Sequence, residues 1–263
     1  MSQVQGRPLM STERRFGIAI SVALILGGIY WALTGLTEST KTSQDSYQVQ
    51  PGDALTVESR SADIEVRAAD VSEIKVERQF ERNVFGSDPT EKYENGKLEL
   101  RDTGCGFLSF GCDTHYVLTV PKDLKLTLQS TSGDVTVSGL TEGADLKSSS
   151  GSIEVQNVGG PQLRMESSSG DLEAHGLSAT SVSTQSSSGS VDLDFTQAPQ
   201  SVEAEASSGD VTIQIPPGDE TYKVDTETSS GDEDSGGIKK DPNAPRTITA
   251  RTSSGDVTVE YNR

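Results

Sequence analysis

The chain has 263 residues, of which 32% are apolar and 5% aromatic. Globular domains are usually close to half apolar, so a thick globular core is not expected. The 40 acidic and 22 basic residues give a net charge of −18. Such a charge opposes binding to nucleic acid and to anionic lipid surfaces, so no nucleic-acid partner is expected.

The N-terminal region contains an uncharged apolar stretch from residue 16 to residue 36. As a helix it would span roughly 30 Å, which is the thickness of the bilayer hydrocarbon. Arg7, Arg14 and Arg15 precede this stretch, and the positive-inside rule places residues 1–15 in the cytoplasm. A cleaved signal peptide is the alternative, but its apolar run is usually about 7 to 15 residues and ends at an Ala-x-Ala site. We predict a signal anchor that crosses the plasma membrane once, with the C-terminal domain extracytoplasmic.

Residues 37–47 are polar and show no apolar periodicity. This composition is typical of a flexible stalk. The stalk is predicted to connect the membrane segment to an ectodomain over residues 48–263.

A short Ser/Thr-rich turn ending in Ser-Gly occurs seven times in the ectodomain, and alternating apolar residues follow most of these turns. The spacing is 18 to 24 residues, and a period near 20 indicates stacked coils. The predicted turn glycines are Gly133, Gly151, Gly170, Gly189, Gly209, Gly231 and Gly255.

Aligning the repeat on its glycine separates inward from outward positions, because side chains alternate along a strand. Apolar residues recur two and four positions after the glycine, as in Val135 and Val137, and again five and seven positions before it. The residue three positions before the glycine is always small. Each coil is therefore predicted to be a strand, a tight turn and a second strand, with the glycine supplying a positive φ or a close backbone approach.

One more coil precedes the seven, because Leu55, Val57, Ile64 and Val66 fit the template with Ala62 in the glycine position. The gap from there to the next coil is predicted to be an insertion over residues 67–120 that caps the N-terminal end of the stack. Its candidate strands are Glu73–Phe80, Lys97–Arg101 and His115–Val120.

These patterns predict an all-β protein. The ectodomain is expected to be a single-stranded parallel β-solenoid, β-helix-like, of about eight coils, with an inserted β-hairpin or cap region and one preceding transmembrane helix.

The repeat fails after Gly231, where Glu233 and Ser235 occupy the core positions. Residues 232–246 have the composition of a loop. The loop could fold over the C-terminal end of the stack, or it could bind a ligand.

Cys105 and Cys112 are predicted to form a disulfide, because they lie close together in an exported domain. With His115 they would make only an incomplete zinc set, so no metal site is expected. Asp follows the turn glycine in five coils. This row is interpreted as structural, and calcium binding is the alternative.

Catalysis has little support in the sequence. His115 and His175 are the two histidines, and no G-x-S-x-G motif occurs. The S-x-x-K match at Ser72 to Lys75 lies in a strand-like run. No enzyme activity and no cofactor are expected.

The run H-Y-V-L-T-V-P-K-D-L-K-L-T-L-Q-S-T-S-G-D-V-T-V from His115 to Val137, followed by the recurring S-S-G-D/S coils, resembles the bacterial putative-adhesin β-strand-repeat family. The resemblance implies a membrane-anchored envelope protein without catalytic residues. The expected function is a non-catalytic cell-surface binding or adhesion module for an envelope protein or polymer. An accessory partner of an envelope stress-response system is the alternative, and an envelope hydrolase is a remote one.

Overall fold

The structure is a computed structural model that describes residues 40–50, 52–81, 88–101 and 114–262. The apolar stretch 16–36 and both cysteines lie outside these residues, so the anchor and the disulfide stay predictions. Within the described ranges all regular secondary structure is β-strand. None of the described segments is a helix that could cross a membrane.

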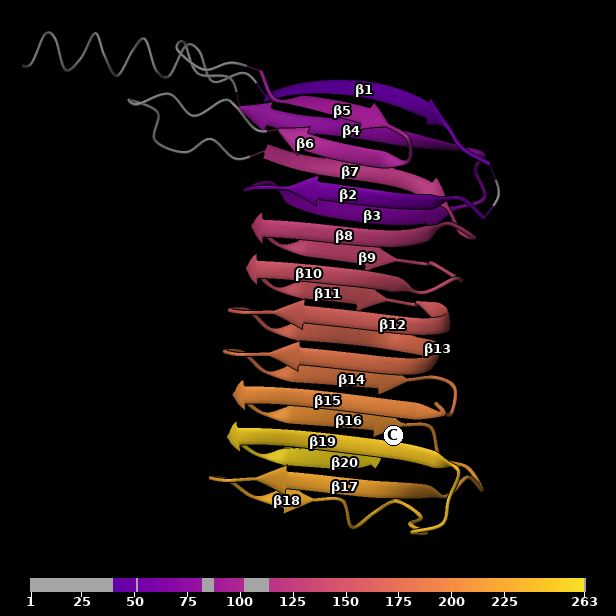
Figure 1. Cartoon of the computed structure of the whole chain (residues 1–263), viewed down its shortest axis with the longest axis vertical. Helices are drawn as coiled ribbons and strands as arrows, with labels where there is room; N and C mark the ends of the chain where they lie inside the picture. Colours follow the sequence, from indigo (N-terminus) through magenta and orange to yellow (C-terminus); the bar gives the residue numbers. More distant parts are fainter. Residues whose placement is uncertain (1–39, 51, 82–87, 102–113, 263) are drawn as a thin grey trace, which may run out of the picture.

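The strands form two sheets that face each other along one stack, and the strands of the repeat pair in parallel (Figure 1). Strands that precede the turn residues form sheet I, strands that follow them form sheet II, and β13 contributes its second half to sheet I and its first half to sheet II. The two strands of each layer, in chain order, are β2 (Ala54–Ser59) and β3 (Asp63–Ala69), β8 (Lys125–Ser132) and β9 (Val135–Ser138), β10 (Ala144–Ser150) and β11 (Ile153–Gln156), β12 (Gly159–Ser167) and the first half of β13 (Leu172–Ser186), the second half of β13 and β14 (Val191–Phe195), β15 (Ser201–Ser208) and β16 (Val211–Ile215), β17 (Tyr222–Thr228) and β18 (Glu233–Asp234), and β19 (Arg246–Ser254) and β20 (Val257–Tyr261).

Matching positions of the repeat lie directly beside one another in neighbouring layers. Val135 pairs with Ile153, Ile153 with Leu172, and Leu172 with Val191, and each of these side chains is at most 1% exposed. Full burial of such a side chain stabilises the fold by roughly 1.5–3 kcal/mol. The predicted parallel stacking of inward apolar residues is confirmed.

The layer with Ala62 at its turn stacks directly on the layer of Gly133, although these residues are far apart in sequence. Strand β2 pairs with β8, and β3 pairs with β9. The residues between them therefore form an insertion, as the sequence predicts.

This insertion covers the N-terminal end of the stack with β4 (Glu73–Glu81), β5 (Thr90–Glu94), β6 (Lys97–Arg101) and β7 (Thr114–Pro121). Strand β7 extends sheet II in parallel with β3, and β6 extends sheet I in parallel with β2. Strand β4 then pairs antiparallel with β7, and β5 with β6. The three strands predicted from the sequence are present, and β5 is an addition.

The expectation of a flexible stalk is wrong for its described part. Residues Thr40–Gln48 form strand β1, which pairs antiparallel with β4 over its whole length. The pairing depends on backbone hydrogen bonds and on contacts at the cap, which leave little apolar signal in the sequence.

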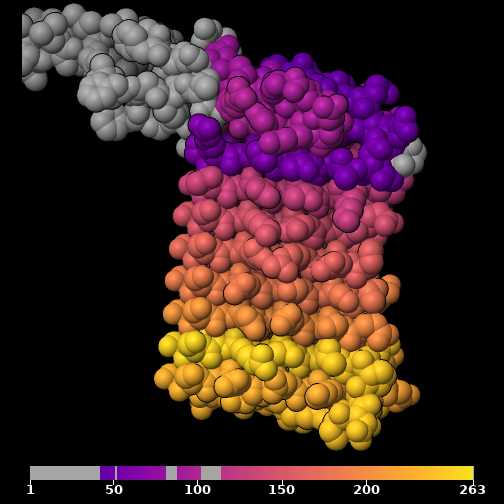
Figure 2. All heavy atoms as spheres, in the orientation of Figure 1, coloured from indigo at the N-terminus to yellow at the C-terminus, as the bar shows by residue number. Residues whose placement is uncertain are grey.

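The C-terminal layers do not follow chain order. Strand β15 pairs with β19, and β19 pairs with β17, so the last strands of the chain lie between two earlier layers. Figure 2 shows this as a yellow band enclosed by orange ones. The loop 232–246 makes the return connection. Its Ile238 is only 6% exposed, and Lys240 forms a β-bridge with Tyr222, so the loop lies against the last layer.

Candidate functional site

The predicted turn glycines line up along one edge of the stack, and all seven have φ between +94° and +150°. A Cβ atom at any of them would lie 2.0–2.4 Å from the carbonyl oxygen of the turn residue in the neighbouring layer. Both features that the sequence predicts at these turns, a positive φ and a close backbone approach, are present. The glycines therefore shape the stack.

The residue after each turn glycine forms a second ladder along the same edge. The Asp134 carboxylate accepts a hydrogen bond from the Ser152 backbone N–H at 2.9 Å, and Asp171 accepts one from Ser190 at 2.8 Å. Where the residue is serine, its hydroxyl takes the same role at 3.3 Å. Each of these oxygens satisfies an amide of the next layer, which supports the structural interpretation of the Asp row.

Within the described part of the chain, no group of three or more His, Cys, Asp or Glu side chains is arranged to hold a metal ion. His115 and His175 lie separately on the outer face of sheet II, next to Glu65 and Glu173. The structure does not bring them together.

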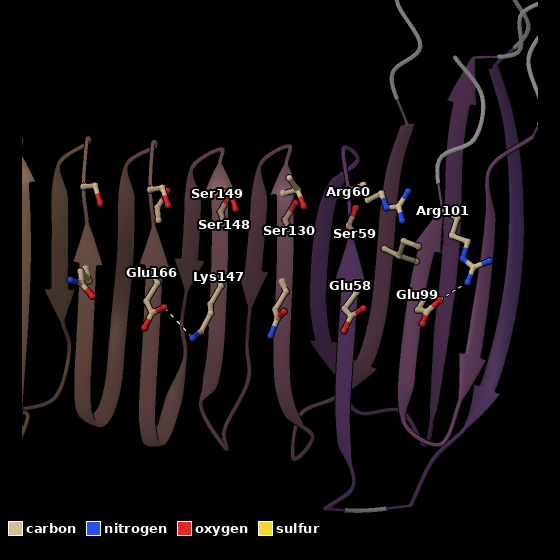
Figure 3. A pocket seen from close by; sticks show the side chains of 17 residues that line it. Glu58, Ser59, Arg60, Glu99, Arg101, Ser130, Lys147, Ser148, Ser149 and Glu166 are labelled. Carbon is tan, nitrogen blue, oxygen red and sulfur yellow. Dashed lines mark hydrogen bonds and ion pairs between the residues drawn. The ribbon is translucent and has the colours of Figure 1, made fainter. Parts of the chain in front are cut away.

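A groove of about 1130 Å³ lies on the outer face of sheet I, over the layers from β6 to the second half of β13. Figure 3 shows the labelled side chains along this surface. Its lining includes one long polar side chain from each layer, four positions before the turn residue. These side chains are Glu58, Gln129, Lys147, Glu166 and Gln185.

A second row in the groove lies two positions before the turn residue. It consists of one arginine, Arg60, followed by four residues with hydroxyl side chains. These are Thr131, Ser149, Ser168 and Ser187. Both rows follow from strand alternation, which places every second residue on the outer face.

Charged groups in the groove are mostly paired with one another. Lys147 contacts Glu166 at 3.0 Å, and Arg101 contacts Glu99 at 2.7 Å. Partial burial acts to raise the pKa of Glu166, but hydrogen bonds from Lys147 and Arg164 outweigh it and the pKa is lowered. The hydrogen bond from Arg101 is the largest cause that lowers the pKa of Glu99. These carboxylates are therefore ionised at neutral pH.

Arg60 is exposed and forms no ion pair with any residue that the structure describes. It and Arg101 lie at the N-terminal end of the groove (Figure 3). This end therefore offers a guanidinium group that a ligand could bind.

A second polar cluster lies inside the cap, between strands β1, β4 and β5. The Glu91 side chain is 3% exposed, and Arg78 contacts it at 2.5 Å and Asp45 at 3.0 Å. The Tyr47 hydroxyl donates to Glu91, and the Tyr47 ring lies 4.7 Å from that of Tyr93. Burial and the nearby Asp45 carboxyl raise the pKa of Glu91 to about 7, against the opposing effect of Arg78.

Sequence reasoning did not identify the groove or the cap cluster. A signal for the groove exists, since the position four residues before each turn residue is always Glu, Gln, Lys or Arg. The cap residues belong to no repeat and carry no comparable signal. The loop predicted from the sequence, 232–246, packs on the last layer, which supports the end-covering alternative.

A family model described as Toastrack DUF4097 matches residues 53–198 and, in a second alignment, residues 125–260. The chain belongs to the Toastrack DUF4097 family. A solved structure described as a putative adhesin has a similar fold. A putative adhesin from Bacteroides fragilis NCTC 9343 is 16% identical with a TM-score of 0.54, over 86% of this chain and 99% of that chain.

Two further structures match with lower TM-scores. A putative cell adhesion protein from Clostridium sporogenes is 11% identical with a TM-score of 0.36, over 84% of this chain and 100% of that chain. A putative adhesin from Parabacteroides distasonis is 14% identical with a TM-score of 0.45, over 86% and 98%. A comparison with curated proteins finds no significant match. The Bacteroides fragilis structure, at 16% identity and a TM-score of 0.54, supports the fold alone, and function has to be argued from the site.

Proposed function

We propose that this Toastrack protein is a single-pass, membrane-anchored extracytoplasmic module that binds an envelope polymer or protein without catalysis. The observation that carries the proposal is the groove on sheet I, where two rows of polar side chains run across successive layers.

The periodicity of the groove suits an extended ligand. Neighbouring strands lie about 4.8 Å apart, so a polymer laid along the stack meets an equivalent side chain at each step. Hydroxyl and amide groups of Ser149, Ser168, Gln129 and Gln185 can donate and accept hydrogen bonds. A ligand that makes many weak contacts at the same time can bind with a useful overall affinity.

The charge of the groove also differs from that of the whole chain. Its lining contains Arg60, Arg101 and Lys147 against Glu58, Glu99 and Glu166, whereas the chain carries a net charge of −18. An acidic envelope polymer would meet less electrostatic repulsion here than on an acidic face.

The solved structure with a TM-score of 0.54 is described as a putative adhesin, and this description is consistent with surface binding. Among the described residues no hydrogen bond joins a groove hydroxyl to a groove carboxylate or lysine, so the proposal does not include hydrolysis.

A photo-crosslinking amino acid placed at Gln129 of the full-length chain, in intact cells, tests the proposal. Gln156 supplies the matched control, because it is also an exposed glutamine but lies on the outer face of sheet II. We expect Gln129 to capture a discrete envelope component that Gln156 does not capture. Equal capture at both positions, or none at Gln129, would contradict binding in the groove.

A charge reversal in the groove provides the second measurement. Lys147→Glu removes the ion pair with Glu166 and places two carboxylates side by side. Capture at Gln129 should fall at least about threefold if the ligand is anionic or hydrogen-bonds to this row. The same reversal at Lys75, on the cap outside the groove, should leave capture unchanged.

A further inference from the structure

The strand at the C-terminal end of sheet I has a neighbour on one side. Strand β17 pairs with β19 from Tyr222 to Thr228. On its other side, the described residues contribute a single β-bridge, between Tyr222 and Lys240. Beyond this bridge the loop turns away, since the Ala244 N–H donates back to the Asp241 carbonyl.

The bridge shows which backbone groups face the open side. The Tyr222 N–H donates to the Lys239 carbonyl, and the Tyr222 carbonyl accepts from the Asp241 N–H. In a parallel pair the N–H and C=O of one residue point to the same side, and the side alternates along the strand. The N–H and C=O groups of Val224 and Thr226 therefore face the open edge. The Thr228 N–H also faces it and donates to the Glu233 carboxylate at 3.3 Å.

Side chains around this edge alternate between half-buried and acidic. Val224 and Thr226 are half-buried and face inward, whereas Asp225 and Glu227 are exposed on the outer face. Arg251 forms ion pairs with both acids, at 2.5 Å from Asp225 and 3.4 Å from Glu227.

The neighbouring strand adds more negative charge to the same end. Asp232, Glu233 and Asp234 are all exposed, and none forms an ion pair with a described residue. Glu233 reaches across to β17 and accepts from the Thr226 hydroxyl at 2.8 Å. The edge thus combines unpaired backbone groups with two sets of side chains. We call Val224 and Thr226 the inner row, and Asp225, Glu227 and the acids of residues 232–234 the acidic rim.

We propose that this edge binds an extended segment of a partner protein, which adds to sheet I in parallel with β17. Lys239 to Asp241 already occupy the first position of such a strand, so the partner would continue beside Val224 and Thr226. Backbone hydrogen bonds supply the affinity in this mode, and side chains at alternate positions supply the specificity. The acidic rim selects basic residues, and the inner row selects small apolar ones.

A second copy of this chain is a poorer occupant of the edge. Two such ends would bring Asp225, Glu227 and the three acids of residues 232–234 against their own counterparts, and like charges across a strand pair are destabilising. The competing interpretation is that the acids only blunt the edge against pairing, as exposed edges often require. The proposal concerns a site remote from the groove and stands independently of the proposed function.

The probe is a synthetic capped peptide of alternating lysine and valine, added to the full chain in detergent micelles and followed by fluorescence anisotropy. One control peptide carries lysines with N-methylated backbone amides, which keep the charge but cannot donate backbone hydrogen bonds. The lysines are chosen because, as at the Tyr222 bridge, the residues that flank the aligned position bond to β17. A second control carries glutamate in place of lysine. We expect the lysine peptide to bind saturably, the N-methylated peptide about tenfold more weakly or worse, and the glutamate peptide not at all.

Two variants place the binding at β17. Thr226→Pro removes an N–H that faces the open edge, where proline is tolerated in strands, and should weaken the peptide at least about tenfold. Asp225→Asn should weaken it about threefold, whereas Asp145→Asn, at the same column of sheet I but on β10, should not.

Backbone amide exchange keeps the test decisive if Thr226→Pro fails to fold. In the unaltered chain the peptide should slow exchange at Val224 and Thr226. Equal binding of the N-methylated peptide, unchanged exchange at these amides, or no binding of the lysine peptide would each overturn the proposal and leave the acidic rim as a blunted edge.

Discussion

The two ends of the stack terminate in different ways. At the N-terminal end, β1, β4 and β5 enclose the ion cluster of Arg78, Glu91 and Asp45. At the C-terminal end, the last layer contributes a two-residue strand, β18, and the Glu233 carboxylate crosses from it to β17.

The comparison shows how a repeat can be terminated. Each inner layer packs against a similar layer on both sides, but an end layer has only one neighbour. The N-terminal end replaces the missing layer with inserted strands. The C-terminal end instead makes the last layer polar, and this leaves part of its edge open.

The largest predicted difference in stability is between a glycine substitution in an inner layer and the same substitution in the end layer. In Gly189→Ala the new Cβ would lie 2.2 Å from the Gly170 carbonyl oxygen at a φ of +142°, with layers on both sides. We expect a loss of at least about 3 kcal/mol in the free energy of unfolding. Gly231→Ala meets a similar contact of 2.0 Å, but its layer can move outward, so the loss should be clearly smaller in urea titrations. Equal losses would show that the end layer is held as firmly as the middle.

The next effect compares two arginines at opposite ends. Arg78 is 14% exposed and neutralises a carboxyl that is 3% exposed, so Arg78→Leu should cost about 3–5 kcal/mol. Arg251 is 42% exposed, and Arg251→Leu should cost less than about 1 kcal/mol. Urea unfolding of both variants measures the difference. Similar costs would mean that the cap cluster is more hydrated than its geometry indicates.

The cap should also make stability depend on pH. Burial raises the pKa of Glu91 to about 7 in the folded state, above its usual value of 4.5 in an unfolded chain. Between these values the folded state binds more protons, so stability should fall as the pH rises from about 4.5 to 7, by on the order of 2 kcal/mol.

Glu91→Gln removes this titration and supplies the control. Its melting temperature should vary less with pH than that of the unaltered chain across this window. An unchanged slope in the variant would assign the pH dependence to other carboxyls.

A smaller effect concerns the ladder of side chains beside the turn glycines. Asp171→Ala leaves the Ser190 amide without its 2.8 Å acceptor and should cost about 1 kcal/mol. Asp171→Ser should recover most of this loss, because serine already fills this role in other layers. If Asp171→Ser is as unstable as Asp171→Ala, the side-chain hydrogen bond to the Ser190 amide does not contribute to the stability of the stack.

The smallest expected effect is that of calcium. Since the ladder oxygens accept amide hydrogen bonds, thermal melting with calcium and with a chelator should give the same midpoint. A large rise with calcium would show that the carboxylates also bind the ion.

Much of the stack could be predicted from the sequence, because one template repeats with strict alternation. The turn glycines and the inward rows follow from that template, and three of the four insertion strands were predicted separately, from their strand-like composition. Strands β1 and β5 were missed because each has hardly any apolar alternation, and their positions depend on the cap cluster.

The reversed order of the last two layers was also missed. The turns at Gly231 and Gly255 have the same Ser-Ser-Gly-Asp sequence, so they do not specify which layer stacks on Gly209. The available signal was Glu233, since a charged residue in a core position fits an end layer better than an inner one. The sequence does not predict the groove, because a row of outward polar residues has the same pattern whether it faces solvent or a ligand.

Hydrogen exchange of individual backbone amides tests the contrast between the two ends most directly. Strand β4 pairs with β1 and with β7, so its amides on both sides should be protected. In β17, Lys223, Asp225 and Glu227 should be protected by β19, whereas Val224 and Thr226 should exchange rapidly. Uniform protection along β17, or exchange in β4 as rapid as at Val224, would contradict an enclosed N-terminal end and an open C-terminal edge.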